Sequence, residues 1–239
     1  MKFDILTLFP EMIEQACSHS IMKRAVDSGV LNINAINPRD FTLDKHNKVD
    51  DTPYGGGAGM VLMAQPYVDA YESVEKINNS ITLMMTPQGE KFDNKMCTEL
   101  AKYDQIVILC GHFEGFDERI RTIIQPKEVS IGDFVLTGGE LPALCLMDSV
   151  SRKLDGTLGK IESMEEDSFE NGLLEYPQYT KPREYRGLNV PEVLLNGNHA
   201  LINEFRYNEQ LKRTKERRPD LYEKYVSNHN PSTKNNTTK

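Results

Sequence analysis

The chain has 239 residues, of which 38% are hydrophobic and 27% charged. This composition fits one large α/β domain with a small second domain, and it excludes a fibrous or fully disordered protein. No apolar run reaches membrane-spanning length, and residues 3–9 lack the basic start of a signal peptide. We therefore expect a cytoplasmic protein with no membrane partner. Four cysteines form no C-x-x-C or Cys/His cluster, so neither a disulfide framework nor a metal site is indicated: Cys17, Cys97, Cys110 and Cys145.

The net charge of −8 is unevenly distributed along the chain. Residues 176–239 carry 12 Lys and Arg against 7 Asp and Glu, a net charge of +5, and residues 1–175 carry 16 against 29, or −13. Opposite signs in the two parts suggest separate roles. Basic side chains concentrate in residues 212–218, where a nucleic-acid backbone would supply the counter-charge. A solvated helix face would show the same pattern.

The first 36 residues show the pattern of a strand, a helix and a second strand. Residues 3–9 form an apolar run, and a helix is predicted from Pro10 to a stop at Gly29. Residues 31–36 then alternate as a strand does. This order implies that the two strands pair in parallel, as in an α/β domain.

Further elements follow the same scheme. A helix of about ten residues is predicted after Gln65 and Pro66, and residues 81–85 and 106–110 are predicted to be buried strands. Apolar residues at helical spacing from Glu140 predict a helix that ends near Arg152. Each buried strand runs into a loop that contains glycine.

Three glycine loops, residues 86–89, 111–115 and 130–139, follow strands that could lie side by side. Glycine lets main-chain groups approach a ligand, which suits recognition of an adenine edge or a ribose. Glu114 or Asp133 could contact a ribose hydroxyl or an ammonium group. No loop has the G-x-G-x-x-G or Walker pattern, which disfavours a dinucleotide or a nucleoside triphosphate. The sequence therefore predicts a pocket for another small molecule.

The composition of the sequence changes after the helix that is predicted to end near Arg152. Residues 1–160 are predicted to form the cofactor-binding domain, and residues 161–172 a flexible linker rich in Gly, Ser and acidic residues. Residues 173–239 are predicted to form a mostly helical second domain. Its tail, which lacks apolar residues from Asn228 onward, is predicted to be disordered.

Five motifs carry a resemblance to a known family. In order, they resemble the motifs of bacterial tRNA (guanine-N1)-methyltransferases of the TrmD type, and they occupy residues 53–60, 110–119, 130–142, 166–169 and 217–221. The resemblance implies a SPOUT-type parallel sheet with a deep trefoil knot, and a homodimer whose active site is shared between subunits. It implies that S-adenosylmethionine donates a methyl group to N1 of guanosine 37 of tRNA, just 3′ of the anticodon, and leaves S-adenosylhomocysteine.

The resemblance also implies roles for individual residues. The cofactor site would consist of Thr86, Pro87, Gln88, Gly89, Gly111, Glu114, Ser130, Ile131, Gly132, Asp133, Phe134, Val135, Leu136, Gly138, Gly139 and Pro142. Asp167 matches the general base and Arg152 the arginine near guanine O6. Without the family, Asp167 would be a solvated linker residue and Arg152 a cation at a helix C-terminus.

RNA contacts are expected from the basic part of the second domain, at Lys212, Arg213, Arg217 and Arg218. Three positions depart from the common family pattern. His112 replaces an arginine, Asn198 a histidine and Phe205 a tryptophan. Mg²⁺ could assist by offsetting charge at O6, although the sequence shows no recognisable metal site.

Two alternatives remain open from the sequence. The first is another SPOUT methyltransferase that acts on a ribose hydroxyl or a ribosomal RNA base, against which the Asp167 segment and the basic second domain argue. The second is a non-catalytic RNA-binding regulator whose α/β domain only dimerises. Such a regulator would not need three open glycine loops.

Overall fold

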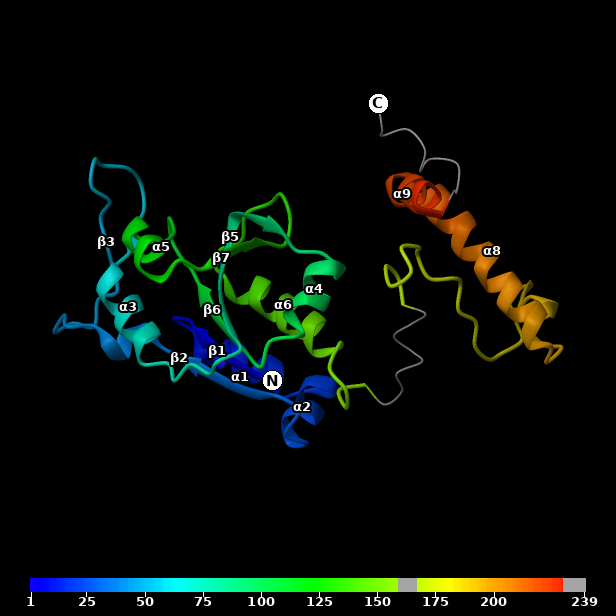
Figure 1. The fold of residues 1–239 in the computed structure, drawn as a ribbon, viewed down its shortest axis with the longest axis horizontal. Coiled ribbons are helices and arrows are strands. Elements are labelled where there is room, and N and C mark those ends of the chain that lie inside the picture. The colour runs from blue at the N-terminus through cyan, green and yellow to red at the C-terminus, as the bar shows by residue number, and fades with distance from the viewer. Residues whose placement is uncertain (159–166, 230–239) are drawn as a thin grey trace, which may run out of the picture. The chain divides into compact units, whose positions relative to one another are not determined.

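The computed structural model describes residues 1–158 and 167–229, and the chain divides into two compact units, Met1–Gly159 and Lys160–Lys239. The first unit is built on a five-stranded sheet of order β2-β1-β6-β5-β7, in which every pair of neighbours is parallel (Figure 1). Its strands are β1 (Lys2–Leu6), β2 (Asn32–Ile36), β5 (Ser80–Lys91), β6 (Gln105–Cys110) and β7 (Lys127–Ser130). The predicted α/β class and the parallel pairing of the first two strands are confirmed.

Helices cover both faces of this sheet. Figure 1 shows α4 and α6 on one side and α3 and α5 on the other. The helices are α1 (Pro10–Cys17), α2 (Ser20–Asp27), α3 (Ala64–Glu72), α4 (Asn94–Leu100), α5 (Glu118–Ile124) and α6 (Glu140–Ser151). Shorter elements are η1 (Pro38–Phe41) and the antiparallel pair β3 (Asp50–Asp51) and β4 (Val61–Leu62).

Strand β6 shows why the sheet lies at the centre of the unit. All six of its residues are buried, as expected of a central parallel strand covered on both faces. Alternate side chains enter different apolar clusters: Ile106 and Ile108 pack with α1, α2, α4 and α6, and Val107 and Leu109 with α3 and α5. The apolar run 106–110 therefore forms the buried central strand of the sheet.

The helix predicted from Pro10 to Gly29 is two helices, and that prediction is wrong. Helix α1 ends at Cys17, and α2 begins at Ser20, whose φ of 52° breaks the regular backbone. A left-handed serine has little sequence signal, since glycine and asparagine are the usual residues there. The first strand also stops at Leu6, because the chain turns away at Thr7, whose hydroxyl accepts a hydrogen bond from the Phe9 amide.

In the second unit, the described residues 167–229 include the helices α8 (His199–Arg217) and α9 (Pro219–His229). Before them come a hairpin, β8 (Glu184–Tyr185) with β9 (Leu188–Asn189), and the short η2 (Glu192–Leu194). Between residues 167 and 198 the chain has no α-helix, so the α-helices in the described part of this unit lie within residues 199–229. Asn228, predicted to begin the tail, belongs to α9, and residues 230–239 lie outside the described residues.

Residues 167–173, in large part expected within a flexible linker, form a hydrogen-bonded turn. The Phe169 amide donates to the Leu173 carbonyl at 2.8 Å, and the Glu175 amide donates to Ser168 Oγ at 2.9 Å. Leu173 is fully buried, and the Leu174 amide donates to Thr214 Oγ1 of α8 at 2.9 Å. The hydrogen bond to Thr214 thus ties this segment to α8. Linker residues 161–166 lie outside the described part of the chain.

Across residues 1–158 and 167–229, no helix combines the length and the apolar character that a membrane crossing requires.

Candidate functional site

A cavity of about 590 Å³ lies at the carboxyl ends of β5, β6 and β7. This volume falls within the range of small-molecule sites, and the carboxyl edge of a parallel sheet is where such sites form. Its walls include every residue of the predicted cofactor site except Gly89 and Asp133. The three predicted glycine loops therefore come together around one cavity.

The remaining wall residues were not predicted as contacts, and they are Met85, His112, Phe113, Gly115, Phe116, Glu118, Arg121, Val129 and Thr137. Most lie within or beside the motifs at 110–119 and 130–142, so the sequence held a signal for them. Arg121 comes from α5, a helix that the sequence analysis did not predict. Gly89 serves a different purpose, since a side chain there would collide with the backbone of Glu128 and Val129 in β7.

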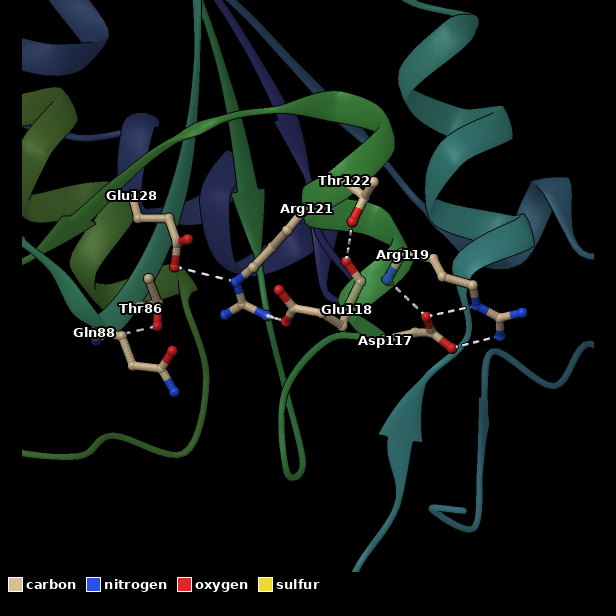
Figure 2. A network of polar contacts seen from close by, with 8 residues as sticks. All are labelled: Thr86, Gln88, Asp117, Glu118, Arg119, Arg121, Thr122 and Glu128. Carbon is tan, nitrogen blue, oxygen red and sulfur yellow. Dashed lines mark hydrogen bonds and ion pairs between the residues drawn. The ribbon is translucent and has the colours of Figure 1, made fainter. Parts of the chain in front are cut away.

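Residues 86–89, predicted as a loop, lie within the range of β5 instead. The ladder between β5 and β7 is interrupted between Met85 and Glu90, where the register shifts. Thr86 Oγ1 accepts a hydrogen bond from the Gln88 amide at 3.3 Å within this interruption (Figure 2). The backbone of residues 86–88 therefore leaves the ladder and faces the cavity.

Two glycines let separate walls of the cavity touch. The Gly139 amide donates to the Gly111 carbonyl at 2.8 Å, and His112 forms an isolated antiparallel bridge with Gly138. A Cβ on Gly139 would lie 2.7 Å from the Cα of Cys110, closer than side chains tolerate. A Cβ on Gly138 would collide with the side chains of His112 and Glu140. Gly139 requires glycine because backbone approaches it closely, whereas a side chain at Gly138 would have to displace the side chains of His112 and Glu140.

A buried carboxylate lies beneath these walls. Glu140, only 2% exposed, is the first residue of α6. Its Oε1 accepts a hydrogen bond from the Thr7 hydroxyl at 2.6 Å, and its Oε2 lies 2.7 Å from Nε2 of His112. The His112 ring also packs on Phe9, with 4.8 Å between ring centroids. One side chain thus joins the segments that follow β1 and β6 to the start of α6.

The buried groups near this carboxylate stay uncharged at neutral pH. Burial, followed by the negative charge of Glu140, raises the pKa of the Cys110 thiol well above its usual value. The pKa of Tyr67 is raised in the same direction, mainly by burial. Tyr67 donates its hydroxyl to the Cys110 carbonyl at 3.0 Å and so braces the end of β6 from α3.

An ion network borders the other side of the cavity (Figure 2). Arg121, whose side chain is 18% exposed, donates from Nε to Glu128 at 3.2 Å and from an Nη atom to Glu118 at 3.1 Å. The network ties α5 to β7. Next to it, Asp117 caps α5 by accepting from the Arg119 amide at 2.9 Å, and hydrogen bonds from the Arg119 side chain lower the pKa of Asp117.

The two predicted catalytic residues belong to different units. Arg152 caps the C-terminus of α6, and its amide donates to the Asp148 carbonyl at 3.1 Å. Asp167 begins the turn in the second unit, and its carbonyl accepts from the Glu170 amide at 3.3 Å. Both side chains are partly exposed. Their predicted roles remain predictions.

The predicted RNA-binding side chains lie at the C-terminal end of α8. Lys212 and Arg217 are exposed, Arg213 is partly exposed, and Arg218 forms a two-pronged ion pair with Asp220 at 2.8 and 2.6 Å. Asn198, where the family usually has histidine, caps the start of α8 by accepting from the Leu201 amide at 3.4 Å. Asn198 therefore serves as a helix cap, a role to which asparagine is well suited.

Within the described ranges, no group of three or more His, Cys, Asp and Glu residues is arranged to hold a metal ion.

The fold and the cavity define a class: an α/β protein with a cavity of small-molecule size at the carboxyl edge of a parallel sheet, with glycine-bearing walls. Residues 1–224 match the family of tRNA (guanine-1)-methyltransferases called TrmD. Relatives from Staphylococcus aureus strains JH9, Newman and N315, each named tRNA (guanine-N(1)-)-methyltransferase, are 53% identical over 225 residues. The match covers 94% of this chain and 92% of each relative. The chain belongs to the TrmD family of enzymes.

Proposed function

We propose that this protein transfers a methyl group from S-adenosylmethionine to N1 of guanosine 37 in tRNA. The observation that carries the proposal is the single cavity lined by nearly all of the residues that the family resemblance assigns to the cofactor. The family is one of enzymes, which removes the reason to prefer a non-catalytic regulator. The names of the relatives specify a guanine of tRNA as the substrate and N1 as the atom that is methylated.

The cavity suits a bent nucleoside in both size and chemistry. Residues 86–88, 111, 131–132 and 134–139 line the cavity, and their main-chain groups would meet the edges of an adenine. Ile131, Leu136 and Pro142 supply apolar contact. When bound, S-adenosylmethionine supplies an electrophilic methyl group on a sulfonium centre.

Asp167 and Arg152 would provide the acid–base chemistry on guanine. N1 of guanine carries a proton at neutral pH, so a carboxylate must remove it as the methyl group arrives. Asp167 is the proposed base, and Arg152 would offset the negative charge that gathers on O6. Well-placed groups of this kind typically accelerate a reaction by about 10²- to 10⁴-fold.

We place Asp167 of one subunit over the cofactor cavity of its partner in a homodimer. The turn that begins at Asp167 is anchored to its own unit through Leu173 and Thr214, so the carboxylate would be presented from a firm base. The deep trefoil knot belongs to the same proposal. Its support is the membership of the chain in the family.

Methyl transfer to two tRNA transcripts tests the proposal. One transcript has guanosine at position 37 preceded by guanosine, and the other differs only by adenosine at position 37. We expect labelled methyl on the first alone, recovered as 1-methylguanosine. Label on both transcripts would point to another RNA target. Label on neither, with cofactor binding verified, would favour another SPOUT activity.

A further inference from the structure

We propose that the tip of the β8–β9 hairpin is an RNA contact, at which an unpaired base stacks on Tyr185 and a neighbouring phosphate pairs with Arg186. The ligand is the tRNA of the proposed function, so the site rests on that function. It adds residues outside the basic end of α8 to the RNA-binding surface. Neither side chain has a part in the chemistry of methyl transfer, and both are assigned to binding and positioning of the RNA.

The hairpin carries an apolar pair that its own chain leaves exposed. Tyr185 and Leu188 lie directly opposite each other in the antiparallel register. Side chains in this relationship have Cβ atoms about 5 Å apart, so the two form one surface. The tyrosine is 60% exposed and the leucine 75%. An exposed aromatic ring beside an aliphatic side chain offers a surface on which a planar base can stack.

The charges around this pair favour a nucleic acid as the ligand. Arg186 directly follows Tyr185, and its guanidinium carbon lies 5.3 Å from the centre of the tyrosine ring. Residues 181–190 carry three Lys and Arg side chains against one carboxylate, a net charge of +2. An aromatic ring with an adjacent guanidinium group suits an unstacked base and its phosphate. The name of the family to which the chain belongs specifies tRNA.

Contacts within its own unit restrain the hairpin. The Gly187 amide donates to Glu184 Oε1 at 2.6 Å, and the Val190 amide donates to the Arg183 carbonyl at 3.0 Å. The Arg183 guanidinium also pairs with Glu192 at 2.7 Å. A restrained hairpin binds RNA at a lower entropy cost, because the loop need not be ordered on contact.

The residue at the turn is not one that the backbone favours. Arg186 and Gly187 both have positive φ, 53° and 80°, as the two central residues of a type I′ hairpin turn require. Asparagine, aspartate and glycine are the usual residues in this conformation, and arginine adopts it rarely. The turn therefore carries an arginine where a smaller residue would fit the backbone better, which points to a role for its charge.

Equilibrium binding of the full chain to the transcript with guanosine 37 tests the site. Tyr185→Leu removes the ring and keeps an apolar side chain, and we expect it to weaken binding about fivefold or more, as loss of one base–aromatic stack does. Tyr185→Phe keeps the ring and is the matched control, with an unchanged dissociation constant. Far-ultraviolet circular dichroism of each variant verifies folding before binding is measured.

The salt dependence of binding separates the two side chains. Arg186→Asn should weaken binding and reduce the slope of log affinity against log salt by about 0.7 to 1, as expected for one lost phosphate contact. Tyr185→Leu should leave the slope unchanged, because stacking releases no counterions. Arg186→Asn should also have a thermal midpoint no lower than the wild type, since asparagine suits the turn. A purely structural arginine would show the opposite shift in midpoint.

The stack itself is measured in transcripts that carry the fluorescent base 2-aminopurine at one unpaired position at a time. The fluorescence of this base changes when it stacks on another ring. We expect one position at which the wild type and Tyr185→Phe produce the same change and Tyr185→Leu does not. That position identifies the base that contacts the hairpin.

Wild-type affinity in Tyr185→Leu, equal weakening in Tyr185→Phe, or a lower midpoint in Arg186→Asn would overturn the proposal. Altered sedimentation of Tyr185→Leu without RNA would also overturn it and assign the apolar pair to a contact between copies of the chain. If the wild type binds tRNA through Tyr185 but transfers no methyl group, the proposed function falls and the RNA contact stands. If Tyr185→Leu binds and methylates tRNA as the wild type does, only the RNA contact falls.

Discussion

The Gly139 amide donates to the Gly111 carbonyl at 2.8 Å, so the start of α6 touches the end of β6 directly. A Cβ at Gly139 would meet the backbone of Cys110 and Gly111, which cannot move without disturbing the central strand. We expect Gly139→Ala to lower the free energy of unfolding by about 1–3 kcal/mol, the usual cost of overpacking. Urea denaturation at neutral pH measures it, and an unchanged midpoint would contradict the contact.

A substitution at Gly138 should have a different effect from a substitution at Gly139. A side chain there would meet the side chains of His112 and Glu140, which can move more readily than backbone. We expect Gly138→Val to keep the fold while it abolishes the thermal shift produced by S-adenosylhomocysteine, since a ligand that binds only the folded state must stabilise it. A retained shift would place the cofactor elsewhere.

Mixed dimers test whether Arg152 and Asp167 act across a subunit interface. Each single variant, Arg152→Ala and Asp167→Ala, should lose methyl transfer by about 10²-fold or more. A heterodimer of the two retains one intact pair if the residues come from different subunits. We expect partial recovery of activity in purified, doubly tagged heterodimers. Activity no higher than in the parent variants would favour a site within one subunit.

The basic end of α8 should determine how tRNA binding depends on salt. Lys212→Ala and Arg217→Ala should each weaken tRNA binding and reduce the slope of log affinity against log salt by about 1, the signature of one lost phosphate contact. Lys23→Ala, an exposed lysine paired with Asp27 in the first unit, is the matched control. Filter binding from 50 to 200 mM salt measures the slopes, and equal slopes in all proteins would remove α8 from the interface.

Thr214 should be essential to the second unit. Its hydroxyl is fully buried, donates to the Gln210 carbonyl at 2.6 Å and accepts from the Leu174 amide at 2.9 Å. Thr214→Val would leave that amide buried without a partner, at a cost of about 1–3 kcal/mol. Thr214→Ser retains the hydroxyl and should cost less. Hydrogen exchange at the Leu174 amide distinguishes them, and equal protection in both variants would contradict this role.

Alkaline pH should destabilise the first unit through Cys17. Burial, followed by the charge of Asp148, raises the pKa of this thiol from 9.0 to about 11. Between these values the unfolded chain binds fewer protons than the folded chain, so the free energy of unfolding falls as pH rises. Cys17→Ser should show a shallower decline in urea denaturation at pH 8, 9.5 and 11. Parallel curves would refute this assignment.

Much of the first unit could be predicted because its strands are apolar runs or alternate between apolar and polar residues. Residues 106–110 and 31–36 have clear patterns, and glycine loops after such strands predicted the cavity edge. The break between α1 and α2 could not be predicted, since it depends on a serine with positive φ. The hydrogen-bond network around Glu140 could not be predicted from the sequence either, because its partners Thr7 and His112 lie 133 and 28 residues away.

The second unit was harder to anticipate for a physical reason. Residues 161–172 are polar and without period, which indicated a flexible segment, yet residues 167–173 are fixed by side-chain caps and by one buried leucine. Hydrogen bonds that Asn171 Oδ1 and Ser168 Oγ accept from nearby amides leave little trace in hydrophobic patterns. The conformation of residues 167–173 therefore depends on local hydrogen bonds that the composition of the segment does not reveal.

The hydrogen bond between Thr7 and Glu140 also bears on how the protein reaches its native state. It joins residues 133 positions apart, and both neighbours of β1 in the parallel sheet are strands distant in sequence. Contacts of such long range form slowly, because the entropy of closing large loops must be lost first. A cofactor bound in the proposed cavity would recognise only the folded chain, so it would act after the rate-limiting step. It should therefore prolong the lifetime of the folded chain without hastening its formation.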